Sequence, residues 1–447
     1  MIPTARTPRP SDQPPRAALD PARFTADVAA AGRRLREVLE QTPLQRNDRL
    51  SELTGADVWI KREDLQVGRS YKVRGAYNTI SQLDAPARAA GVVCASAGNH
   101  GQGVAYACRV LGVRGKVFVP RTTPRQKRGR IAALGREFVE LVVVGDTYDE
   151  AAAAALCDAA TTGATLVPAF DALATVVGQA TVAVELLEQL GSAPDVVLLP
   201  VGGGGLLAGC ATWLRLHSPA TRLVGVEPAG AAMPVRSGPT TVAPGMAAAL
   251  AAGAPVELAE MDGFVDGAAV RRAGDITFPL VRDAQVELVT VPEGHVCTEI
   301  LELYQVDGVI AEPAGALASA ALTGGIVSVE PGQSVVCLLS GGNNDVSRYA
   351  EVVERSLVHR GLKHYFLVEF PQEPGALRRF LDDVLGPDDD IVLFEYVKRD
   401  NRETGAALTG IELSSAEGLA ELLERTAASP LRIERLAPGT TAYRFLV

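Results

Sequence analysis

Four consecutive glycines, Gly202–Gly205, constrain the fold more than any other feature of this chain. They separate the apolar run Asp195–Val201 from the helical pattern Leu206–Leu216, and this order predicts a buried strand, a tight turn and a helix. Because glycine has no Cβ, the backbone N–H groups of the turn and of the helix N-terminus can approach a ligand closely. The turn therefore predicts an anion site suited to a phosphate.

The alternation of short apolar runs with longer alanine-rich helical patterns extends from about residue 25 to about residue 350. It predicts an α/β fold in which helices cover both faces of parallel sheets. Strands are expected at Val58–Lys61, Val92–Ala95, Lys116–Val119, Phe138–Val143, Val196–Pro200, Leu223–Val226 and Val335–Leu339. Helices are expected at Gly103–Leu111, Tyr148–Thr161, Gly178–Leu190 and Leu206–Leu216. These strands suffice for two α/β lobes, which we assign to residues 25–350.

A different pattern begins near residue 350, where a helical segment leads into short alternating strands. Residues 360–447 have the order strand, helix, strand, strand, helix, strand, which predicts a small α+β domain of ferredoxin-like order. The strands are expected at His364–Phe370, Ile391–Val397, Ala406–Leu413 and Thr440–Leu446. The region has no cluster of nucleophile and base, which favours a regulatory or binding role and leaves an oligomer-forming module as the alternative.

Length and composition indicate a globular chain with small-molecule rather than nucleic-acid ligands. The 447 residues exceed what one core usually supports, and the net charge of −10 argues against nucleic-acid binding, which depends on lysine and arginine. Six scattered cysteines without C-x-x-C spacing indicate free thiols in a reducing, cytoplasmic compartment. Residues 1–20 lack the apolar core of a signal peptide and are expected to be a disordered tail, and no later run suits a membrane span.

A candidate reactive amine accompanies the glycine turn. Lys72 lies far upstream of the turn, among the small residues of Ser70–Ala76. A lysine amine and a phosphate turn are together what pyridoxal phosphate needs, because its aldehyde forms a Schiff base and its phosphate needs backbone donors. Pyridoxal 5′-phosphate is therefore the expected cofactor.

Polar loops follow two other predicted strands. Ser96–Gln102 comes after Val92–Ala95, precedes a helix and is rich in hydrogen-bond donors, so it is suited to hold a carboxylate. Ser340–Asn344 follows Val335–Leu339 in the same way. Taken alone, Asn99 and Ser340 also fit the role of a cap or turn residue, and His100 fits a structural role.

A dinucleotide site is the rival interpretation of the glycine turn. Glu227 ends the next predicted strand, where a ribose-binding acid would stand, so a nicotinamide oxidoreductase is a possible alternative. The glycines are contiguous rather than spaced as G-x-G-x-x-G, however, and this function would leave Lys72 unexplained. A purely structural turn and a non-catalytic amino-acid sensor are the remaining alternatives.

Together these motifs resemble the fold-type II pyridoxal-phosphate enzymes, whose catalytic unit has two tryptophan synthase β-like lobes. Within that group the chain is similar to the biosynthetic threonine dehydratases, and residues 360–447 are similar to their ACT-like regulatory domain. The matching stretches are Thr42–Leu44, Lys61–Asp64, Ser70–Ala76, Ser96–Gln102, Gly202–Leu206, Phe264–Thr277, Ala311–Ala316, Ser340–Asn343 and Glu369–Leu377. The resemblance implies a lyase that deaminates L-threonine to 2-oxobutanoate and ammonia in isoleucine biosynthesis.

The resemblance also implies a role for each matching residue. Lys72 would form the Schiff base, Asn99 would bond the ring hydroxyl and Ser340 would face the pyridine nitrogen. The phosphate would be held by Gly202, Gly203, Gly204, Gly205 and Leu206, and the substrate carboxylate by Ser96, Ala97, Gly98, Asn99 and His100. Isoleucine is the implied allosteric effector, and a homotetramer is the implied assembly.

Departures from related enzymes bear on the reaction. Serine dehydratases and racemases of the same fold are the alternatives within the family. Racemases resemble this chain with serine in place of Ala97, and alanine cannot donate the proton that racemisation needs. Some relatives also carry a cation site after the strand ending at Glu227, but Ala231-Ala232-Met233 follows here without a second carboxylate. We therefore expect no metal, and the tail has room for only one ACT-like unit.

Overall fold

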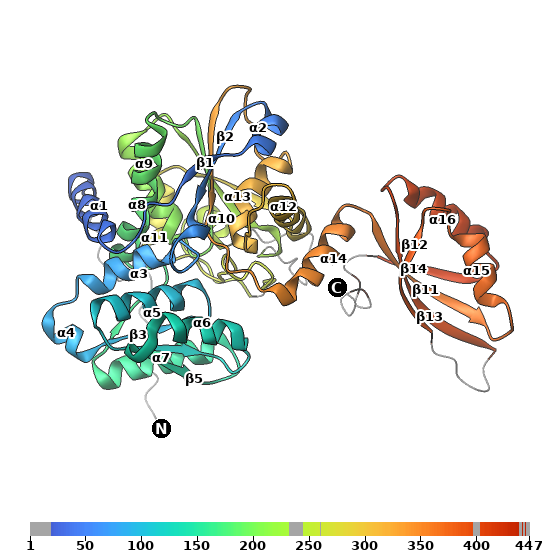
Figure 1. Cartoon of the computed structure of the whole chain (residues 1–447), viewed down its shortest axis with the longest axis horizontal. Coiled ribbons are helices and arrows are strands. Elements are labelled where there is room, and N and C mark those ends of the chain that lie inside the picture. Colours follow the sequence, from blue (N-terminus) through green and yellow to red (C-terminus); the bar gives the residue numbers. More distant parts are fainter. Residues whose placement is uncertain are drawn as a thin grey trace.

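The computed structural model describes residues 19–231, 245–259, 261–396 and 403–437, together with Thr440 and Tyr443. Three sheets organise these residues into two adjacent α/β lobes and a C-terminal unit, which lies beyond helix α14 (Tyr349–His359) (Figure 1). Of the predicted disordered tail, residues 1–18 lie outside the described part. Asp20 caps the first helix, α1 (Pro21–Arg36), by accepting from Ala22 N at 3.0 Å.

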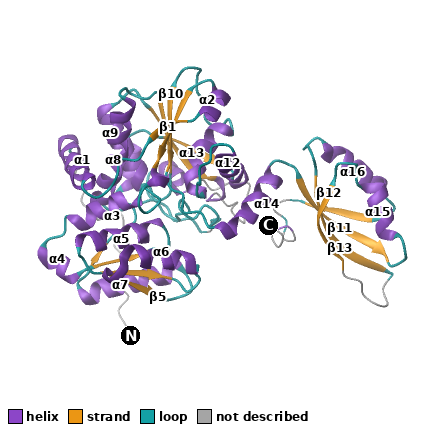
Figure 2. Cartoon of the chain, viewed as in Figure 1, coloured by secondary structure: helices purple, strands orange, loops and turns teal. Residues whose placement is uncertain are grey.

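The larger lobe is built on a six-stranded sheet in which every pairing is parallel except that of β1 with β2. Its strands are, in spatial order, β1 (Leu44–Arg46), β2 (Asp57–Arg62), β10 (Ser334–Leu339), β7 (Val196–Pro200), β8 (Arg222–Pro228) and β9 (Glu287–Val291). All five residues of β7 are buried, as expected of a central parallel strand with helices on both faces. Figure 2 shows helices surrounding this sheet.

The smaller lobe has a four-stranded parallel sheet. Its spatial order is β5 (Val139–Val143), β4 (Gly115–Val119), β3 (Val92–Ala95) and β6 (Thr165–Leu166). Helix α7 (Tyr148–Thr162) packs against this sheet and has sharp ends, because Thr147 and Glu150 form a reciprocal capping box and Gly163 adopts the left-handed conformation. The predicted α/β class is confirmed in both lobes.

Helices connect the strands of the two lobes. They are α2 (Asp48–Thr54), α3 (Lys72–Ser81), α4 (Ala85–Ala90), α5 (Asn99–Leu111), α6 (Arg125–Gly135), α8 (Leu173–Leu190), α9 (Gly205–His217), α10 (Gly245–Ala252), α11 (Thr277–Asp283), α12 (Glu293–Gln305) and α13 (Pro313–Thr323). By length and composition α8 is apolar enough to cross a membrane, but 56% of it is buried, against α9, α3 and α1. We interpret α8 as a core helix.

The C-terminal unit has its own core and an antiparallel sheet of order β12-β13-β11-β14. Its elements are β11 (Lys363–Pro371), α15 (Ala376–Val384), β12 (Asp390–Tyr396), β13 (Thr404–Glu412), α16 (Gly418–Ala428) and β14 (Arg432–Leu436). This is the predicted ferredoxin-like order. The last strand was expected at Thr440–Leu446, but β14 precedes that segment, most of which lies outside the described residues.

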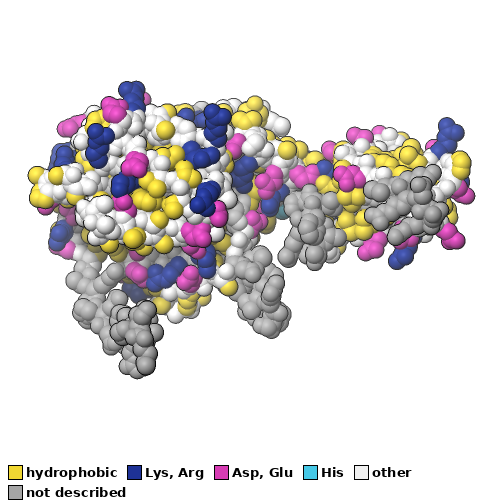
Figure 3. Space-filling view, turned by 90° about the horizontal axis from the view of Figure 1, so that it is seen from below, with side chains coloured by type: hydrophobic (Ala, Val, Ile, Leu, Met, Phe, Trp, Pro, Cys, Tyr) yellow, Lys and Arg dark blue, Asp and Glu magenta, His cyan; other side chains and the backbone are white. Residues whose placement is uncertain are grey.

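Two helix starts differ from the prediction. α5 begins at Asn99 rather than Gly103, and α8 begins at Leu173 rather than Gly178. In α5 polar and small residues form the first turn, where an apolar stripe gives no signal, and in α8 the first residue, Leu173, is exposed. On the molecular face in Figure 3, lysine and arginine side chains are interspersed with aspartate and glutamate.

Candidate active site

The site forms where two neighbouring parallel strands end. β2 leads toward Lys72 and β10 leads directly into Ser340, and Arg62 at the end of β2 lies opposite Leu339 at the end of β10. A backbone hydrogen bond joins the loops beyond the two strands: Tyr71 N donates to Ser340 O at 3.1 Å. The sheet thus brings together two predicted site residues that are far apart in sequence.

Lys72 is the first residue of α3. Its ammonium Nζ donates to the carbonyl oxygen of Ala169 at 3.4 Å and lies 5.2 Å from the centre of the Tyr71 ring. Nearby, the hydroxyl of Ser70 is buried and has no hydrogen-bond partner among the described residues. A polar atom left unpaired beside the amine fits a site that receives a polar ligand.

The glycine turn lies against the residue that follows Ala169. Gly203 and Gly205 contact Phe170 so closely that a Cβ on Gly203 would come within 2.5 Å of the ring, and one on Gly205 within 2.9 Å of Phe170 Cα. Gly204 has a φ of +92°, which favours glycine. Lys72 and the turn therefore meet at the Ala169-Phe170 dipeptide, and a side chain on Gly203 or Gly205 would collide with Phe170.

Neighbouring side chains hold the turn in place. Thr277 Oγ1 donates to Gly203 O at 2.6 Å, and Leu206 lies buried in the first turn of α9. The first N–H groups of α9 have no intrahelical acceptors and carry the positive end of the helix dipole. A phosphate group fits this cradle, and with the amine of Lys72 the donor set fits pyridoxal phosphate.

Asn99 lies at the start of α5, and its amide is bonded on both sides. Its Nδ2 donates to Glu312 Oε1 at 2.6 Å, and its Oδ1 accepts from Asn343 Nδ2 at 2.7 Å. The preceding residues Ser96, Ala97 and Gly98 are partly exposed, so the loop is open at the N-terminus of α5. That position suits a substrate carboxylate.

His100 is placed differently from the other residues of its loop. Its ring is buried, and Nε2 lies 2.8 Å from Val167 O, just beyond β6. Burial lowers the pKa of His100 to about 4, so the ring is neutral. Among the five residues predicted to bind the substrate carboxylate, His100 is therefore the least available.

A buried ion network holds the first turn of α3. Arg74 donates two hydrogen bonds to Glu63, both at 2.8 Å, and two to Glu185, at 2.6 and 2.8 Å. Lys61 Nζ donates to Glu185 at 2.7 Å and to the carbonyl of Thr42 at 2.6 Å. Burial alone would raise the pKa of Glu63, but the charge and hydrogen bonds of Arg74 hold it below its usual range. The network fixes the helix that starts at Lys72.

Glu227 does not support the dinucleotide interpretation. Its carboxylate accepts from Met246 N at 2.9 Å and from Ala247 N at 3.0 Å, at the N-terminus of α10. Both oxygens thus bind a helix of the protein itself, and the side chain is buried, so it is not presented to a ribose. Groups of three or more potential metal ligands are absent from the described residues, and Ala232 and Met233 of the loop after Glu227 lie outside them.

Sequence reasoning missed Glu312 and Phe170 as site residues. Glu312 stands in a matching stretch, Ala311–Ala316, but only the three-dimensional structure shows that its side chain reaches Asn99, at the N-terminus of α5. Phe170 lies in the connection between β6 and α8, where neither spacing nor charge gave a signal. Its proximity to the glycine turn is visible only in three dimensions.

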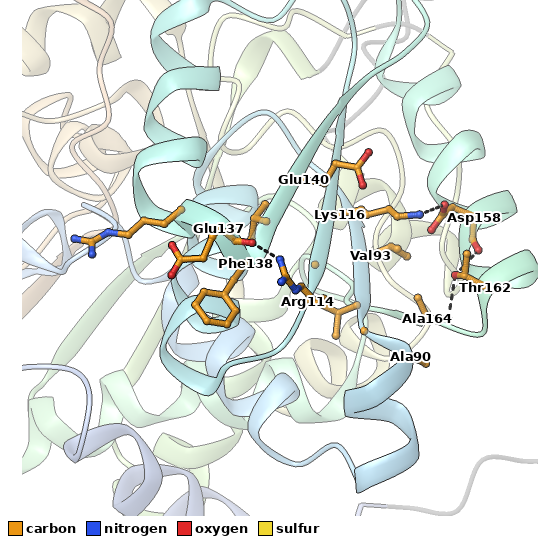
Figure 4. Close-up of a pocket in the computed structure, with 15 residues that line it drawn as sticks. Ala90, Val93, Arg114, Lys116, Glu137, Phe138, Glu140, Asp158, Thr162 and Ala164 are labelled. Atoms are coloured by element: carbon orange, nitrogen blue, oxygen red, sulfur yellow. Dashed lines mark hydrogen bonds and ion pairs between the residues drawn. The ribbon is translucent and has the colours of Figure 1, made fainter.

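A separate pocket of about 340 Å³ lies at the opposite end of the small sheet. It lies at the amino ends of β3, β4 and β5, whereas the site residues follow carboxyl ends. Two of its cations are already bonded, Lys116 to Asp158 at 2.6 Å and Arg114 to the carbonyl of Glu137 (Figure 4). We therefore do not assign this pocket to the chemistry at Lys72.

Comparison with known families gives two matches that together span most of the chain. Residues 35–341 match a family described as pyridoxal-phosphate dependent enzyme, and residues 354–446 match the C-terminal regulatory domain of threonine dehydratase. The first match includes Lys72, Asn99, the glycine turn and Ser340.

Curated relatives match over nearly their whole length. The L-threonine dehydratase biosynthetic IlvA of Mycobacterium tuberculosis is 61% identical over 424 residues, which cover 94% of this chain and 96% of that protein. The protein of the same name from Bacillus subtilis is 46% identical over 422 residues, covering 94% and 96%.

Solved structures resemble the chain over about three quarters of its length. The processed form of threonine deaminase isoform 2 from Solanum lycopersicum has a TM-score of 0.68 at 34% identity and covers 75% of this chain and 93% of its own. Maize serine racemase has a TM-score of 0.66 at 27% identity and covers 75% and 98%.

Proposed function

Because the chain belongs to the pyridoxal-phosphate dependent enzymes, as a member of the biosynthetic L-threonine dehydratases, we propose that it deaminates L-threonine to 2-oxobutanoate and ammonia. The observation that carries this proposal is 61% identity to a biosynthetic L-threonine dehydratase along 94% of the chain. The enzyme is a lyase that uses pyridoxal 5′-phosphate. The reaction is the first step of isoleucine biosynthesis.

Lys72 is the proposed base. When bound, pyridoxal phosphate supplies an aldehyde for the substrate amine and a ring that makes the Cα proton acidic. The Lys72 amine would take the Cα proton of the bound substrate, for which it must be in its neutral form. The Lys72 Nζ lies 3.4 Å from a carbonyl oxygen beside the glycine turn, so the amine and the phosphate cradle are placed for one ligand.

Gly202–Gly205 and Leu206 are proposed to hold the phosphate with backbone N–H groups at the start of α9. Asn99 is proposed to bond the ring hydroxyl, and Ser340 to donate a hydrogen bond to the pyridine nitrogen. A hydroxyl at this nitrogen does not force its protonation, whereas a carboxylate would stabilise the charged ring. Ser340 therefore favours elimination over transamination.

The substrate carboxylate is proposed to bind at Ser96–Asn99, at the open N-terminus of α5. Ala97 lies in this loop and has no proton to donate, which supports elimination rather than racemisation. A serine dehydratase is the second candidate, since one methyl group on the substrate is worth only about 1–3 kcal/mol of discrimination.

The C-terminal unit is proposed to bind isoleucine as a feedback inhibitor. A pocket of about 280 Å³ lies at the turn between β11 and α15 and is lined by Phe370, Phe394, Tyr396 and residues 371–377. Its aromatic rings suit a branched aliphatic side chain. α15 has no side-chain N-cap, so its first N–H groups suit a carboxylate.

Assembly and location are further parts of the proposal. A homotetramer is implied by resemblance to the family, and a cytoplasmic site of action agrees with the absence of disulfides among the described residues. Sedimentation of the purified holoenzyme measures the assembly directly.

One assay tests the proposed reaction. Purified holoenzyme is incubated with L-threonine or L-serine, with and without isoleucine, and 2-oxo acid formation is measured. We expect 2-oxobutanoate from threonine, a lower rate with isoleucine and no product from a Lys72→Ala variant. Wild-type turnover by Lys72→Ala would refute the assignment of the base, and NADH binding without visible cofactor absorption would favour the oxidoreductase.

A further inference from the structure

Glu312 is a buried acid beside the proposed cofactor site that the roles above leave unused. It stands at the N-cap position of α13, but its side chain makes no capping hydrogen bond to that helix. Its carboxylate is turned instead toward α5, where Oε1 accepts from Asn99 Nδ2 at 2.6 Å. Gly341, next to Ser340, lies against the same oxygen, and a Cβ there would collide with it.

Stability alone does not explain this acid. Glu312 is 5% exposed, and within the described ranges no lysine or arginine forms an ion pair with it. A buried carboxylate without a cationic partner is costly. Burial raises the pKa of Glu312 to about 7, and the charge of Asp266 acts in the same direction. The hydrogen bond from Asn99 and the charge of Lys127 of α6, which pairs with Asp266 at 2.7 Å, oppose this shift.

The hydrogen bonds of Asn99 indicate what the carboxylate does. Asn99 Oδ1 is occupied by Asn343 Nδ2, and one hydrogen of its Nδ2 is occupied by Glu312. A flipped amide would place Asn99 Oδ1 against the carboxylate and Nδ2 against a donor, and both contacts are unfavourable. The second N–H of Asn99 Nδ2 therefore has no acceptor among the residues that the structure describes, and its direction is fixed.

We propose that Glu312 is a positioning residue, whose carboxylate fixes the Asn99 amide so that its free N–H meets the ring hydroxyl of pyridoxal phosphate. This inference rests on the cofactor role proposed for Asn99 but does not depend on which amino acid is the substrate. Glu312 acts through Asn99 and does not itself touch the reacting atoms.

The test is a double-mutant cycle on the full-length holoenzyme with Glu312→Gln and Asn99→Ala. The Glu312→Gln substitution preserves side-chain size but presents N–H groups or a weaker acceptor to Asn99. We expect Glu312→Gln to weaken cofactor binding about tenfold, to shift its visible absorption, and to lower kcat more than KM changes. In the Asn99→Ala background, the same substitution should change the spectrum and affinity little further.

Additive effects in the cycle, or a wild-type spectrum, cofactor affinity and kcat for Glu312→Gln, would overturn the proposal. If Glu312→Gln does not fold, Asn343→Ala is the second test, because it removes the hydrogen bond that Asn343 Nδ2 donates to Asn99 Oδ1. A shift of the spectrum with this variant that disappears in the Asn99→Ala background supports a fixed Asn99, and no shift refutes it. The visible spectrum is measured without substrate. It therefore tests the role of Glu312 even if the protein does not turn over threonine.

Discussion

The ring of Phe170 lies so close to Gly203 that a Cβ on Gly203 would come within 2.5 Å of it. The contact places the phosphate cradle beside Ala169, whose carbonyl oxygen accepts from Lys72. A small side chain on Gly203 would therefore displace Phe170 or shift the turn. Gly205 also contacts Phe170, whereas Gly204 has a positive φ and Gly202 lies against Ala268, so each glycine of the turn has its own reason.

We expect Gly203→Ala to weaken pyridoxal phosphate binding at least tenfold, or about 1.4 kcal/mol, because its methyl group would collide with the Phe170 ring and shift the turn that holds the phosphate. Equilibrium dialysis followed by visible absorption measures the affinity. Gly129→Ala in α6 is the matched control, since a Cβ there meets nothing within 4 Å. Equal affinities for the two variants would contradict a tight cradle.

We expect Arg74→Met to destabilise the catalytic lobes by about 3–5 kcal/mol, because Glu63 and Glu185 would lose their shared cation in a buried site. Urea unfolding followed by fluorescence measures the change. Arg36→Ala removes an exposed ion pair with Glu188 and should cost less than about 1 kcal/mol. A similar loss in the free energy of unfolding for both variants would show that the buried Arg74 network stabilises the protein no more than an exposed ion pair does.

We expect Glu227 to make the protein less stable as pH rises from about 4.5 to about 7. Burial raises the pKa of Glu227 to about 7 in the folded chain, although two backbone N–H groups oppose the shift. Between these pH values the folded state keeps a proton that the unfolded state has lost. The stability contributed by Glu227 is therefore fully present below about pH 4.5, and it is lost as the pH rises through about 7.

Melting temperatures of Glu227→Gln and wild type at about pH 5 and about pH 8 test the preceding expectation. The melting temperature of the variant should decrease less between the two pH values than that of wild type. The corresponding difference in the free energy of unfolding should be at most about 3 kcal/mol. Glu52→Gln, an exposed residue of α2, is the control and should follow wild type. A Glu227→Gln curve parallel to wild type would rule out titration of this residue.

We expect Tyr396→Ala to raise the isoleucine concentration needed for half inhibition about tenfold, since it removes one wall of the pocket. Basal threonine turnover should stay unchanged, because the residue lies in the C-terminal unit. Leu367→Ala, an exposed β11 residue that does not line the pocket, is the control. Unaltered inhibition of Tyr396→Ala would place the effector elsewhere.

The sequence allowed the lobes, the strand β7 and the glycine turn to be predicted, because apolar runs and glycines report local structure directly. It did not reveal Glu312, whose role depends on a hydrogen bond to Asn99, which is 213 residues away in the sequence. It also missed β14, because the closing strand was expected at Thr440–Leu446, most of which lies outside the described residues. β14 is an edge strand with charged, exposed residues, whereas the apolar segment after it looked more strand-like.

Strand β10 is the only partner that joins β2 to β7 among the described pairings of the large sheet. It is also the last of the six strands to be synthesised. A nascent chain that has not passed residue 339 holds two partial sheets with open edges, which are prone to aggregate. The proposed cofactor site between Lys72 and Ser340 can therefore form only after the final strand of this sheet has been synthesised.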